Sequence, residues 1–354
     1  MHRAPIPHPG SAPAASPAPV SRPDRPAGQP LWVPELSVVI VNYRQWQDTW
    51  ALVRQLRQSP ALREGSAEVV VVDNHSPADP AGRRLRRCPE VSLWRSRRNG
   101  GFAAAANRGC RLGLGRWLLL LNPDVSVPAG FLDRVIALAD SLAAAEPSAG
   151  VVGFGLRHSD GSRQHSFGPF PTLFGSLARL LLPRARRKYH ALAPPQRCRV
   201  PWLTGCCLLV RRECYDQLGG FDEDFFLYYE DVDLCRRAAA CGWSVWYEPD
   251  LTVTHHRPLH ARAVPVHLRL FTRHASLTYA RKHWPGWHAR GLARLVGAAA
   301  WLRRHLAAWR GDTGAAEAFA TLGAIAADLA ADQPDAARRR LGRFVRRREA
   351  QLVR

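Results

Sequence analysis

The sequence lacks the long apolar runs of a membrane-spanning protein. No stretch of eighteen or more uninterrupted apolar residues occurs, and the longest candidates, Trp117–Leu121 and Leu203–Val210, have the length of strands. His2 and Arg3 are not followed by an apolar segment, which argues against a secretory signal. We therefore expect a cytoplasmic protein, either free or attached peripherally to the inner face of the plasma membrane.

Several common site motifs are also missing. Neither GxGxxG nor GxxxxGK(S/T) follows any expected strand, which argues against other nucleotide-dependent enzymes. The eight cysteines include the adjacent pair Cys206 and Cys207 but no CxxC and no zinc-like spacing, so we expect reduced, mostly buried thiols. No helix-turn-helix, zinc-finger or RNA-binding signature appears, so specific nucleic-acid binding is not expected.

Lysine is nearly absent, yet the formal net charge is +21. Only Lys188 and Lys282 occur, so arginine supplies almost all of the positive charge. One interpretation is a GC-rich coding sequence without chemical meaning. The other is attraction to polyanions, and of these an anionic membrane surface is favoured over nucleic acid.

The composition predicts three regions. Residues 1–34 are rich in Pro, Ala and Ser and are predicted to form a disordered leader. Residues 35–261 are predicted to form an α/β domain, and 262–354 an Arg-rich helical region with a break at Pro285.

Within residues 35–261, apolar runs that indicate buried strands alternate with segments of helical spacing. The expected strands are 36–42, 68–73, 91–96 and 116–122, and the expected helices are 46–56, 103–112 and 128–144. This order predicts a mostly parallel sheet with helices on both faces.

Polar residues follow the expected strands at their carboxyl ends, where ligands bind in such sheets. They are Asn42, Tyr43, Asp73, Asn74, Asn99 and the segment Asn122–Asp124. Later in the chain we expect a strand over 202–212, a helix over 231–241 ended by Gly242, and a strand over 243–249.

Three groups of residues can carry chemistry. Asp124 at a strand end can bind a divalent cation, or it can simply cap the next helix. Glu230, Asp231 and Asp233 cluster at a helix start, where capping explains some of the carboxylates, and one of them can accept a proton from an attacking hydroxyl. His255 can join Asp124 as a metal ligand, or it can be an ordinary surface histidine.

These segments, taken together, resemble the GT-A family-2 glycosyltransferases and are similar to their bacterial rhamnosyltransferase-like branch. The resemblance covers about residues 36–260. It rests on VVIVNY (38–43), VVVVDNHS (69–76), RNGGFAAAANRG (98–109), LLLNPDV (119–125), TGCCLLVRR (204–212), GGFDEDFFLYYEDVDLCRR (219–237) and YEPDLTVTHH (247–256), in the family's order.

The resemblance implies roles for individual residues and a Rossmann-like GT-A fold. Asp231 matches the family's general base, with Glu230 beside it, while Asp124 and His255 match its metal ligands for Mg2+ or Mn2+. The implied donor-binding residues are Asn42, Tyr43, Asp73, Asn74, Asn99, Asn107 and Asn122, and Trp202 and Gly205 are expected on the acceptor side. The family's DxD motif appears as Asn122-Pro123-Asp124, so one metal carboxylate is missing. Ala106 stands where many relatives have a second Asn, and Arg257-Pro258 replaces a Gly-rich continuation.

The implied activity is an inverting transfer of a sugar from a nucleotide-diphosphate donor to a hydroxyl of a glycan or lipid-linked acceptor, in cell-envelope polysaccharide biosynthesis. Rhamnose from a thymidine-diphosphate donor is the expectation from the branch alone. A catalytically silent scaffold is the alternative.

The helical stretches 292–309 and 337–354 mix apolar residues with arginine, and they either lie on anionic lipid or pack on the catalytic domain with solvated arginines.

Overall fold

The structure is a computed structural model that describes residues 33–176, 196–258 and 264–353. Every described residue belongs to one compact unit, Val33–Arg354. Almost all of the predicted disordered leader lies outside the described residues, and so does the basic segment RARRKYH (184–190), which its composition predicts to be an exposed loop.

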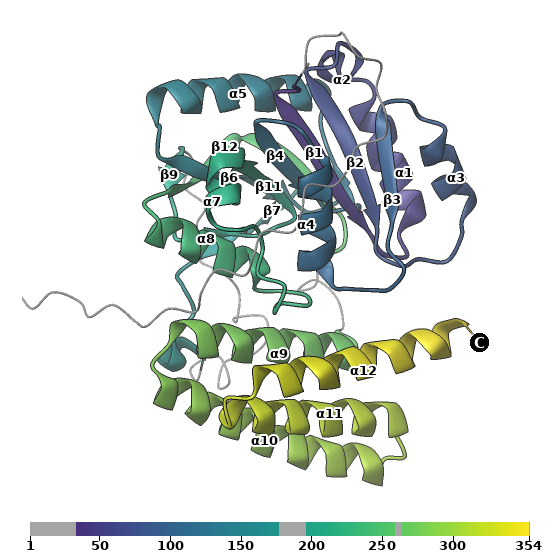
Figure 1. Cartoon of the computed structure of the whole chain (residues 1–354), viewed down its shortest axis with the longest axis vertical. Helices are drawn as coiled ribbons and strands as arrows, with labels where there is room; N and C mark the ends of the chain where they lie inside the picture. Colours follow the sequence, from purple (N-terminus) through teal and green to yellow (C-terminus); the bar gives the residue numbers. More distant parts are fainter. Residues whose placement is uncertain (1–32, 177–195, 259–263, 354) are drawn as a thin grey trace, which may run out of the picture. The chain divides into compact units, whose positions relative to one another are not determined.

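The elements of this unit follow one another in the order expected for repeated strand–helix units (Figure 1). The strands are β1 (Leu36–Asn42), β2 (Ala67–Asp73), β3 (Val91–Arg95), β4 (Trp117–Leu121), β5 (Val125–Ser126), β6 (Ala149–Arg157), β7 (Arg163–Gln164), β8 (Phe167–Gly168), β9 (Cys198–Arg199), β10 (Trp202–Leu203), β11 (Cys207–Arg211) and β12 (Ser244–His255). The helices are α1 (Trp46–Leu56), α2 (Pro60–Arg63), α3 (Pro80–Arg86), α4 (Phe102–Leu112), α5 (Phe131–Ala145), α7 (Arg212–Gln217), α8 (Glu230–Ala240), α9 (Val266–His283), α10 (Gly286–Trp309), α11 (Thr313–Ala330) and α12 (Pro334–Val353).

The central sheet runs in the order β3-β2-β1-β4-β11-β6-β12-β5. Strands β3, β2, β1 and β4 are parallel to one another, and β12 is parallel to β6. The predicted, mostly parallel sheet is therefore confirmed. Strand β11 differs, because it lies antiparallel between β4 and β6.

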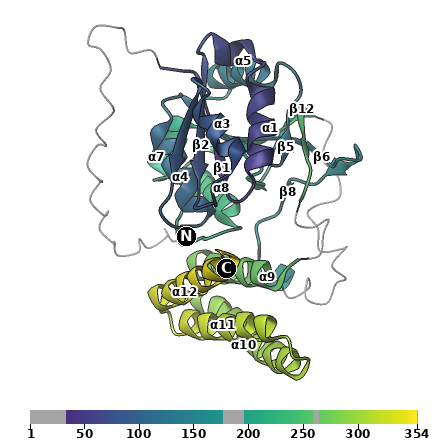
Figure 2. The ribbon, with the colours of Figure 1, turned by 90° about the vertical axis from the view of Figure 1, so that its right-hand side faces the viewer.

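Helices cover both faces of this sheet because its strands are apolar on both sides. One core joins the strands to α1, α3 and α5, and a second core joins them to α4, α7 and α8. Figure 2 shows α4 and α7 on one side of the strands and α1 on the other. Helix α4 lies very close to the sheet, since a Cβ built on Gly109 would stand 2.3 Å from Val39 Cγ1.

The predicted single strand over 202–212 is wrong. Residues 204–206 form a turn that separates β10 from β11. The turn is held from two sides, because the carbonyl of Cys206 accepts a hydrogen bond from the N–H of Asn122 and the N–H of Gly205 donates to Asp231. These long-range contacts end the strand at a point where the apolar sequence continues.

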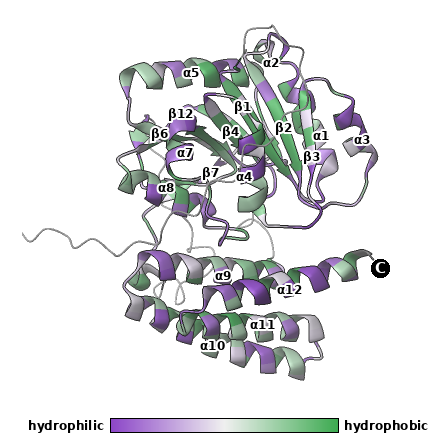
Figure 3. Cartoon of the chain, viewed as in Figure 1, coloured by the Kyte–Doolittle hydropathy of each residue, from purple (hydrophilic) through white to green (hydrophobic). Residues whose placement is uncertain are grey.

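The region after residue 264 consists of the four helices α9–α12, and the predicted break at Pro285 separates α9 from α10. A third core of apolar side chains joins these helices. In the described part of the chain, no helix is long and apolar enough to cross a membrane. Figure 3 shows hydrophilic and hydrophobic residues mixed along α10 and α12.

Candidate active site

A cavity of about 1080 Å³ lies where several strands end. Its walls come from the residues that follow β1, β2 and β4, from the turn between β10 and β11, from the start of α8, and from α9–α12. Ten of the predicted site residues line it: Tyr43, Asn74, Asn99, Asn122, Asp124, Trp202, Gly205, Glu230, Asp231 and His255. The strand edge therefore brings together residues that are far apart in the sequence.

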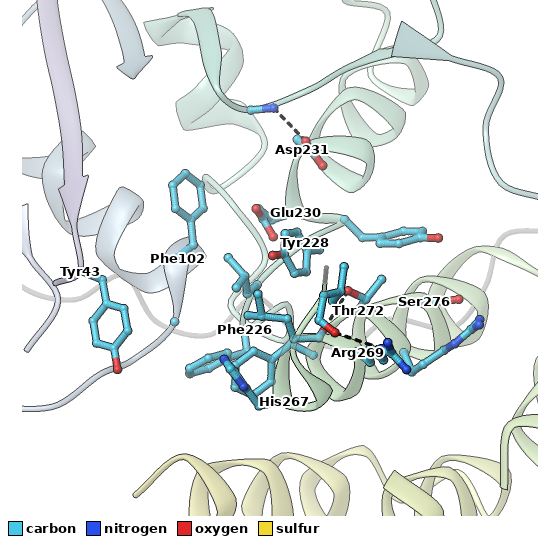
Figure 4. A pocket seen from close by; sticks show the side chains of 18 of the residues that line it. Tyr43, Phe102, Phe226, Tyr228, Glu230, Asp231, His267, Arg269, Thr272 and Ser276 are labelled. Carbon is cyan, nitrogen blue, oxygen red and sulfur yellow. Dashed lines mark hydrogen bonds between the residues drawn. The ribbon is translucent and has the colours of Figure 1, made fainter. Parts of the chain in front are cut away.

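The acidic pair lies at the start of α8. Tyr228 and Tyr229, directly before it, have positive φ angles of 74° and 68°, a conformation that non-glycine residues rarely adopt. This double left-handed turn directs the chain into α8, so that Glu230 and Asp231 face the cavity. In Figure 4, Glu230 and Tyr228 lie between Phe102 on one side and Thr272 of α9 on the other.

The two carboxylates have different surroundings. Asp231 Oδ2 accepts a hydrogen bond from the N–H of Gly205 and Oδ1 accepts one from the N–H of Val232, both at 2.8 Å. Glu230 Oε2, in contrast, is buried without a hydrogen-bond partner among the described residues. Burial raises the pKa of both groups, but the two N–H donors oppose the rise at Asp231, whereas repulsion by Asp231 adds to it at Glu230. The pKa of Glu230 is therefore raised well above its usual value, and that of Asp231 is raised less strongly.

Asp124 and His255 form a second polar group at the cavity. Their Oδ1 and Nε2 atoms are 3.5 Å apart, and Arg257 Nε lies 3.9 Å from Asp124 Oδ2. Burial alone would raise the pKa of Asp124, but the hydrogen bond and charge of His255 and the charge of Arg257 lower it. Burial alone would lower the pKa of His255, but Cys206 and Asp124 raise it to about 10.

The side chain of Gln164 fixes the far side of the imidazole. Its Nε2 is 3.0 Å from His255 Nδ1, while its Oε1 is buried without a partner in the described part of the chain. Turning the Gln164 amide over places Oε1 against a protonated Nδ1, where it accepts a hydrogen bond. A cation bound at Asp124 would then take the place of the Nε2 proton, so that Nδ1 donates to Gln164 while Nε2 coordinates the cation, as in metal-binding histidines.

These two ligands fit a cation held partly by the protein and partly by substrate. No group of three or more His, Cys, Asp or Glu side chains that could hold a metal ion occurs among the described residues. Mg2+ is commonly bound through one or two carboxylates together with phosphate oxygens and water. A site with Asp124 and His255 as its protein ligands is consistent with that chemistry.

Comparison with known proteins decides the family. Residues 34–275 match the family described as "Glycosyltransferase like family 2". The chain belongs to this family. It is 34% identical over 291 residues to an N-acetylglucosaminyl-diphospho-decaprenol L-rhamnosyltransferase of Mycobacterium tuberculosis, which covers 77% of this chain and 92% of the relative.

Two further proteins are similar to this glycosyltransferase. The low-salt glycan biosynthesis hexosyltransferase Agl10 of Haloferax volcanii is 28% identical, over 59% of this chain and 63% of its own. A solved mannosyltransferase of Pyrobaculum calidifontis, in complex with GDP-Man and Mn2+, is 20% identical, covers 89% of both chains and has a TM-score of 0.48. The predictions of a family-2 glycosyltransferase and of an α/β fold are confirmed.

Two residues predicted to bind the donor lie behind the cavity of this glycosyltransferase and do not line it. Asp73 is completely buried and accepts hydrogen bonds from Asn42 Nδ2, from the N–H of Ser76 and from Arg95 Nε. Asn42 Oδ1 accepts from the N–H of Gln45. Both side chains are used within the protein, so they position the strand ends from behind instead of facing a ligand.

Asn107 is also displaced from its predicted place. It is buried on α4, where its Nδ2 donates to the carbonyl of Phe221 and to Glu223, and its Oδ1 accepts from Tyr215 and from the N–H of Phe221. Four hydrogen bonds satisfy the whole amide. In the structure Asn107 fixes the loop after Gly220 and does not line the cavity, so its predicted contact with the donor has no support from this geometry.

Asn74 and Asn99 do lie at the cavity and hold each other. Asn74 Nδ2 donates to Asn99 Oδ1 at 2.9 Å and to the carbonyl of Gly101, and Asn74 Oδ1 accepts from the N–H of Gly100. Tyr43 donates from its hydroxyl to Glu349 of α12 across 3.1 Å. The edge of the cavity formed by Tyr43 thus touches the C-terminal helices directly.

The C-terminal wall of the cavity is absent from the sequence predictions. On α9 it includes His267, Arg269, Phe271 and Thr272. Helical spacing of apolar and basic residues was the only available signal. That signal predicts an amphipathic helix without indicating that its inner side faces a catalytic cavity.

Proposed function

We propose that this glycosyltransferase moves L-rhamnose from a nucleotide-diphosphate donor to a hydroxyl of a lipid-linked glycan, with inversion at the anomeric carbon. The main observation in support of this reaction is that Asp231 lines the same cavity as the Asp124–His255 pair. The choice of sugar and acceptor is supported by the relative from Mycobacterium tuberculosis, whose name states an L-rhamnosyl transfer to a decaprenol-linked N-acetylglucosamine. Such a product belongs to cell-envelope polysaccharide assembly.

Asp231 is the proposed general base. Its two backbone hydrogen bonds fix the carboxylate and leave the remaining lone pairs free for an acceptor hydroxyl. A pKa raised by burial suits a group that must accept a proton near neutral pH. As Asp231 takes the proton, the hydroxyl oxygen bonds to the anomeric carbon, and the bond from that carbon to the diphosphate breaks on the opposite face.

Glu230 supports the base without acting as one. Burial and the neighbouring charge raise the pKa of its carboxyl group and so favour the protonated form, which makes Asp231 the proposed anion of this adjacent pair, while Asp233 is paired with Arg237 and His283. A protonated carboxyl group can also donate a hydrogen bond into the cavity. This division of roles between two adjacent acids follows from their different hydrogen bonding.

The donor diphosphate is proposed to lie at Asp124 and His255. A divalent cation bound by these residues would neutralise the charge that develops on the leaving diphosphate. Arg257 and Arg44 also line the cavity and can pair with phosphate oxygens. Asn122 stands two residues before Asp124, and Tyr43, Asn74 and Asn99 are proposed to contact the nucleoside and sugar.

The acceptor is proposed to enter between Trp202, Gly205 and the C-terminal helices. The cavity there has an apolar lining that comes from α9, α10, α11 and α12, interspersed with Arg269, Arg273, Arg303 and Arg348. Apolar surface suits a lipid chain, and guanidinium groups suit the diphosphate that links such a chain to a sugar. This combination favours a lipid-linked acceptor over a free oligosaccharide.

A transfer assay tests the proposal. The purified full chain is incubated with nucleotide-diphosphate sugars that differ in sugar and base, together with N-acetylglucosaminyl-diphospho-polyprenol and Mn2+ or Mg2+. We expect a new disaccharide lipid with a deoxythymidine-diphosphate rhamnose donor, and a linkage of opposite anomeric configuration to that of the donor. Folded protein without turnover on any donor would contradict the proposal and favour the silent scaffold.

A further inference from the structure

The exposed apolar side chains of this protein are concentrated on one helix. Among the described residues, nine large hydrophobic side chains are exposed, and six of them belong to α10. Trp309 is 83% exposed, Trp287 67% and Trp301 63%. Phe174, 76% exposed, lies 6.4 Å from the ring of His288 on α10 and adds to the same surface. Isolated exposed apolar residues are ordinary, but a contiguous group marks an interaction site.

Helix α10 buries small side chains and exposes large ones, which is the reverse of what the burial of apolar surface favours. Its buried positions include the alanines Ala289, Ala293, Ala300 and Ala307, which face the core of the helical region, whereas its tryptophans point outward. At 100° per residue, the three tryptophans lie within about 80° of arc, on the side opposite those alanines. Burying a tryptophan releases far more apolar area from water than burying an alanine does. The outer face of α10 is therefore built to be covered by something else.

The charges on α10 indicate what covers it. The helix carries four arginines and no acidic residue. At 100° per residue, Arg294 lies among the three tryptophans, Arg290 and Arg304 border them on one side, and Arg303 lies beyond the exposed leucines on the other. Long arginine side chains beside an apolar face can reach lipid headgroups while the aromatic residues enter the boundary between headgroups and acyl chains.

A second copy of this chain fits the same face less well. A symmetric dimer through α10 would bring each arginine-bordered face against an identical one, without any carboxylate on the helix to pair with the guanidinium groups. An anionic bilayer supplies both the apolar layer and the negative charge. We propose that the outer face of α10, with Trp287, Trp301 and Trp309 as its anchors, lies in the surface of an anionic membrane.

This face also borders the catalytic cavity. Leu295 is 51% exposed and also lines the cavity. Arg303 is likewise an exposed residue that lines the cavity. A lipid-linked acceptor in the bilayer would thus meet the cavity at the edge of α10, so in this respect the inference rests on the proposed function. Membrane binding itself does not require sugar transfer.

Flotation of the full chain with vesicles tests the inference without any catalytic step. We expect the protein to float with vesicles of phosphatidylcholine and phosphatidylglycerol, and to float less with phosphatidylcholine alone or in high salt. Trp301→Ala/Trp309→Ala should weaken partitioning about tenfold or more. These side chains are outside the cavity, so sugar transfer to a water-soluble acceptor analogue should be unchanged.

A matched pair of charge variants separates a specific face from general basicity. Arg290→Glu/Arg294→Glu on α10 should reduce partitioning by at least about fivefold per arginine, since each arginine near an anionic surface contributes on that order. Arg83→Glu/Arg86→Glu on α3, with the same change in net charge at exposed positions, should bind as the unmodified chain does.

Three results would overturn the inference. The first is no flotation with phosphatidylglycerol vesicles, and the second is equal flotation by the Trp301→Ala/Trp309→Ala variant. The third is a dimer, seen by sedimentation without vesicles, that this variant converts to monomer, which would assign the face to a second copy. None of these results bears on whether the enzyme transfers rhamnose, which the transfer assay decides.

Discussion

Asp231 is joined to Gly205 by a hydrogen bond in which the Gly205 N–H donates to Asp231 Oδ2 across 2.8 Å. The bond connects the start of α8 to the turn between β10 and β11, both of which line the cavity. A Cβ on Gly205 would stand only 3.4 Å from the Cβ of Asp231, so the turn and the carboxylate are in close contact. The position of the proposed base thus depends on a turn that interrupts an apolar run.

Asp231→Asn should abolish most turnover while the fold is kept. An amide oxygen can still accept the Gly205 hydrogen bond, but it cannot take a proton from the acceptor, so we expect kcat to fall by about 10²- to 10⁴-fold. Initial rates of sugar transfer, together with melting temperatures, measure both effects. Asp216→Asn, at an exposed position on α7, is the control and should be fully active. Near-normal activity of Asp231→Asn would remove this residue from the mechanism.

Glu230→Gln should stabilise the protein at neutral pH and have little effect in acid. Burial, followed by repulsion from Asp231, raises the pKa of Glu230 in the folded state. The stabilisation from the protonated carboxyl group is complete below the usual pKa of a glutamate and is lost as pH rises through the raised folded pKa. The neutral amide has no such loss. Thermal unfolding from about pH 4 to pH 8 should show the two melting curves diverging as pH rises.

The control for this comparison is Glu64→Gln, at an exposed position after α2. Its difference from the unmodified chain should be constant with pH. A constant difference for Glu230→Gln as well would show that the folded state does not favour the protonated form of that residue.

Asn107 and Asn99 should respond to substitution in opposite ways. Asn107→Ala removes four buried hydrogen bonds and leaves the N–H and C=O of Phe221 without their partner, so we expect a loss of about 2–4 kcal/mol in unfolding free energy. The folded fraction should keep its donor KM. Asn99→Ala changes the cavity wall, and we expect a donor KM raised about tenfold with a smaller loss of stability. A raised donor KM for Asn107→Ala, without destabilisation, would restore the original prediction of a donor contact.

The sequence predicts the strand edge better than the orientation of α4. Tyr43, Asn74 and Asp124 could be placed at one edge because parallel strands end together. The direction of Asn107 could not be predicted, since the rotation of α4 about its axis is set by the close packing of Gly109 on Val39. A motif gives the order of residues along a helix, but a contact between distant residues decides which of them faces the ligand.

The C-terminal wall illustrates a second limit of the sequence. The apolar and basic spacing of α9, α10 and α12 predicted helices, and helices are present. The same spacing left open whether the arginine-rich stretches pack or stay exposed. Burial now distinguishes them, because Leu341, Phe344 and Val345 of α12 lie in the core of the helical region while Trp301 and Trp309 of α10 are outside it.

Asp124→Asn should remove the metal-dependent part of donor binding. A ligand that binds only the folded chain raises the melting temperature by mass action, and a donor bound through a cation does so only when the cation is present. We expect the unmodified protein to melt a few degrees higher with a nucleotide diphosphate and Mn2+ than with the nucleotide and a chelator. The variant should give the same curve in both conditions. The control is Asp250→Asn, at an exposed position on β12, which should behave as the unmodified chain. If Asp124→Asn still melts higher with Mn2+ than with the chelator, the Asp124 carboxylate is not a metal ligand.

Gly101→Ala should damage both stability and donor binding, because the backbone at this point has no room for a side chain. Gly101 has a φ of 90°, and a Cβ there would lie 2.4 Å from the carbonyl oxygen of Phe226, which accepts a hydrogen bond from the N–H of Phe102. The substitution must therefore strain the backbone and separate the loop before α4 from the segment before the acidic pair. We expect a loss of about 1–3 kcal/mol in unfolding free energy, together with a raised donor KM as Asn99 and Asn74 lose their positions.

Gly100→Ala is the matched control, since its Cβ would meet only Ala104 at 3.4 Å and its N–H can still donate to Asn74. If the two variants prove equally stable and active in denaturant unfolding and transfer assays, the close approach between Gly101 and Phe226 does not organise this site.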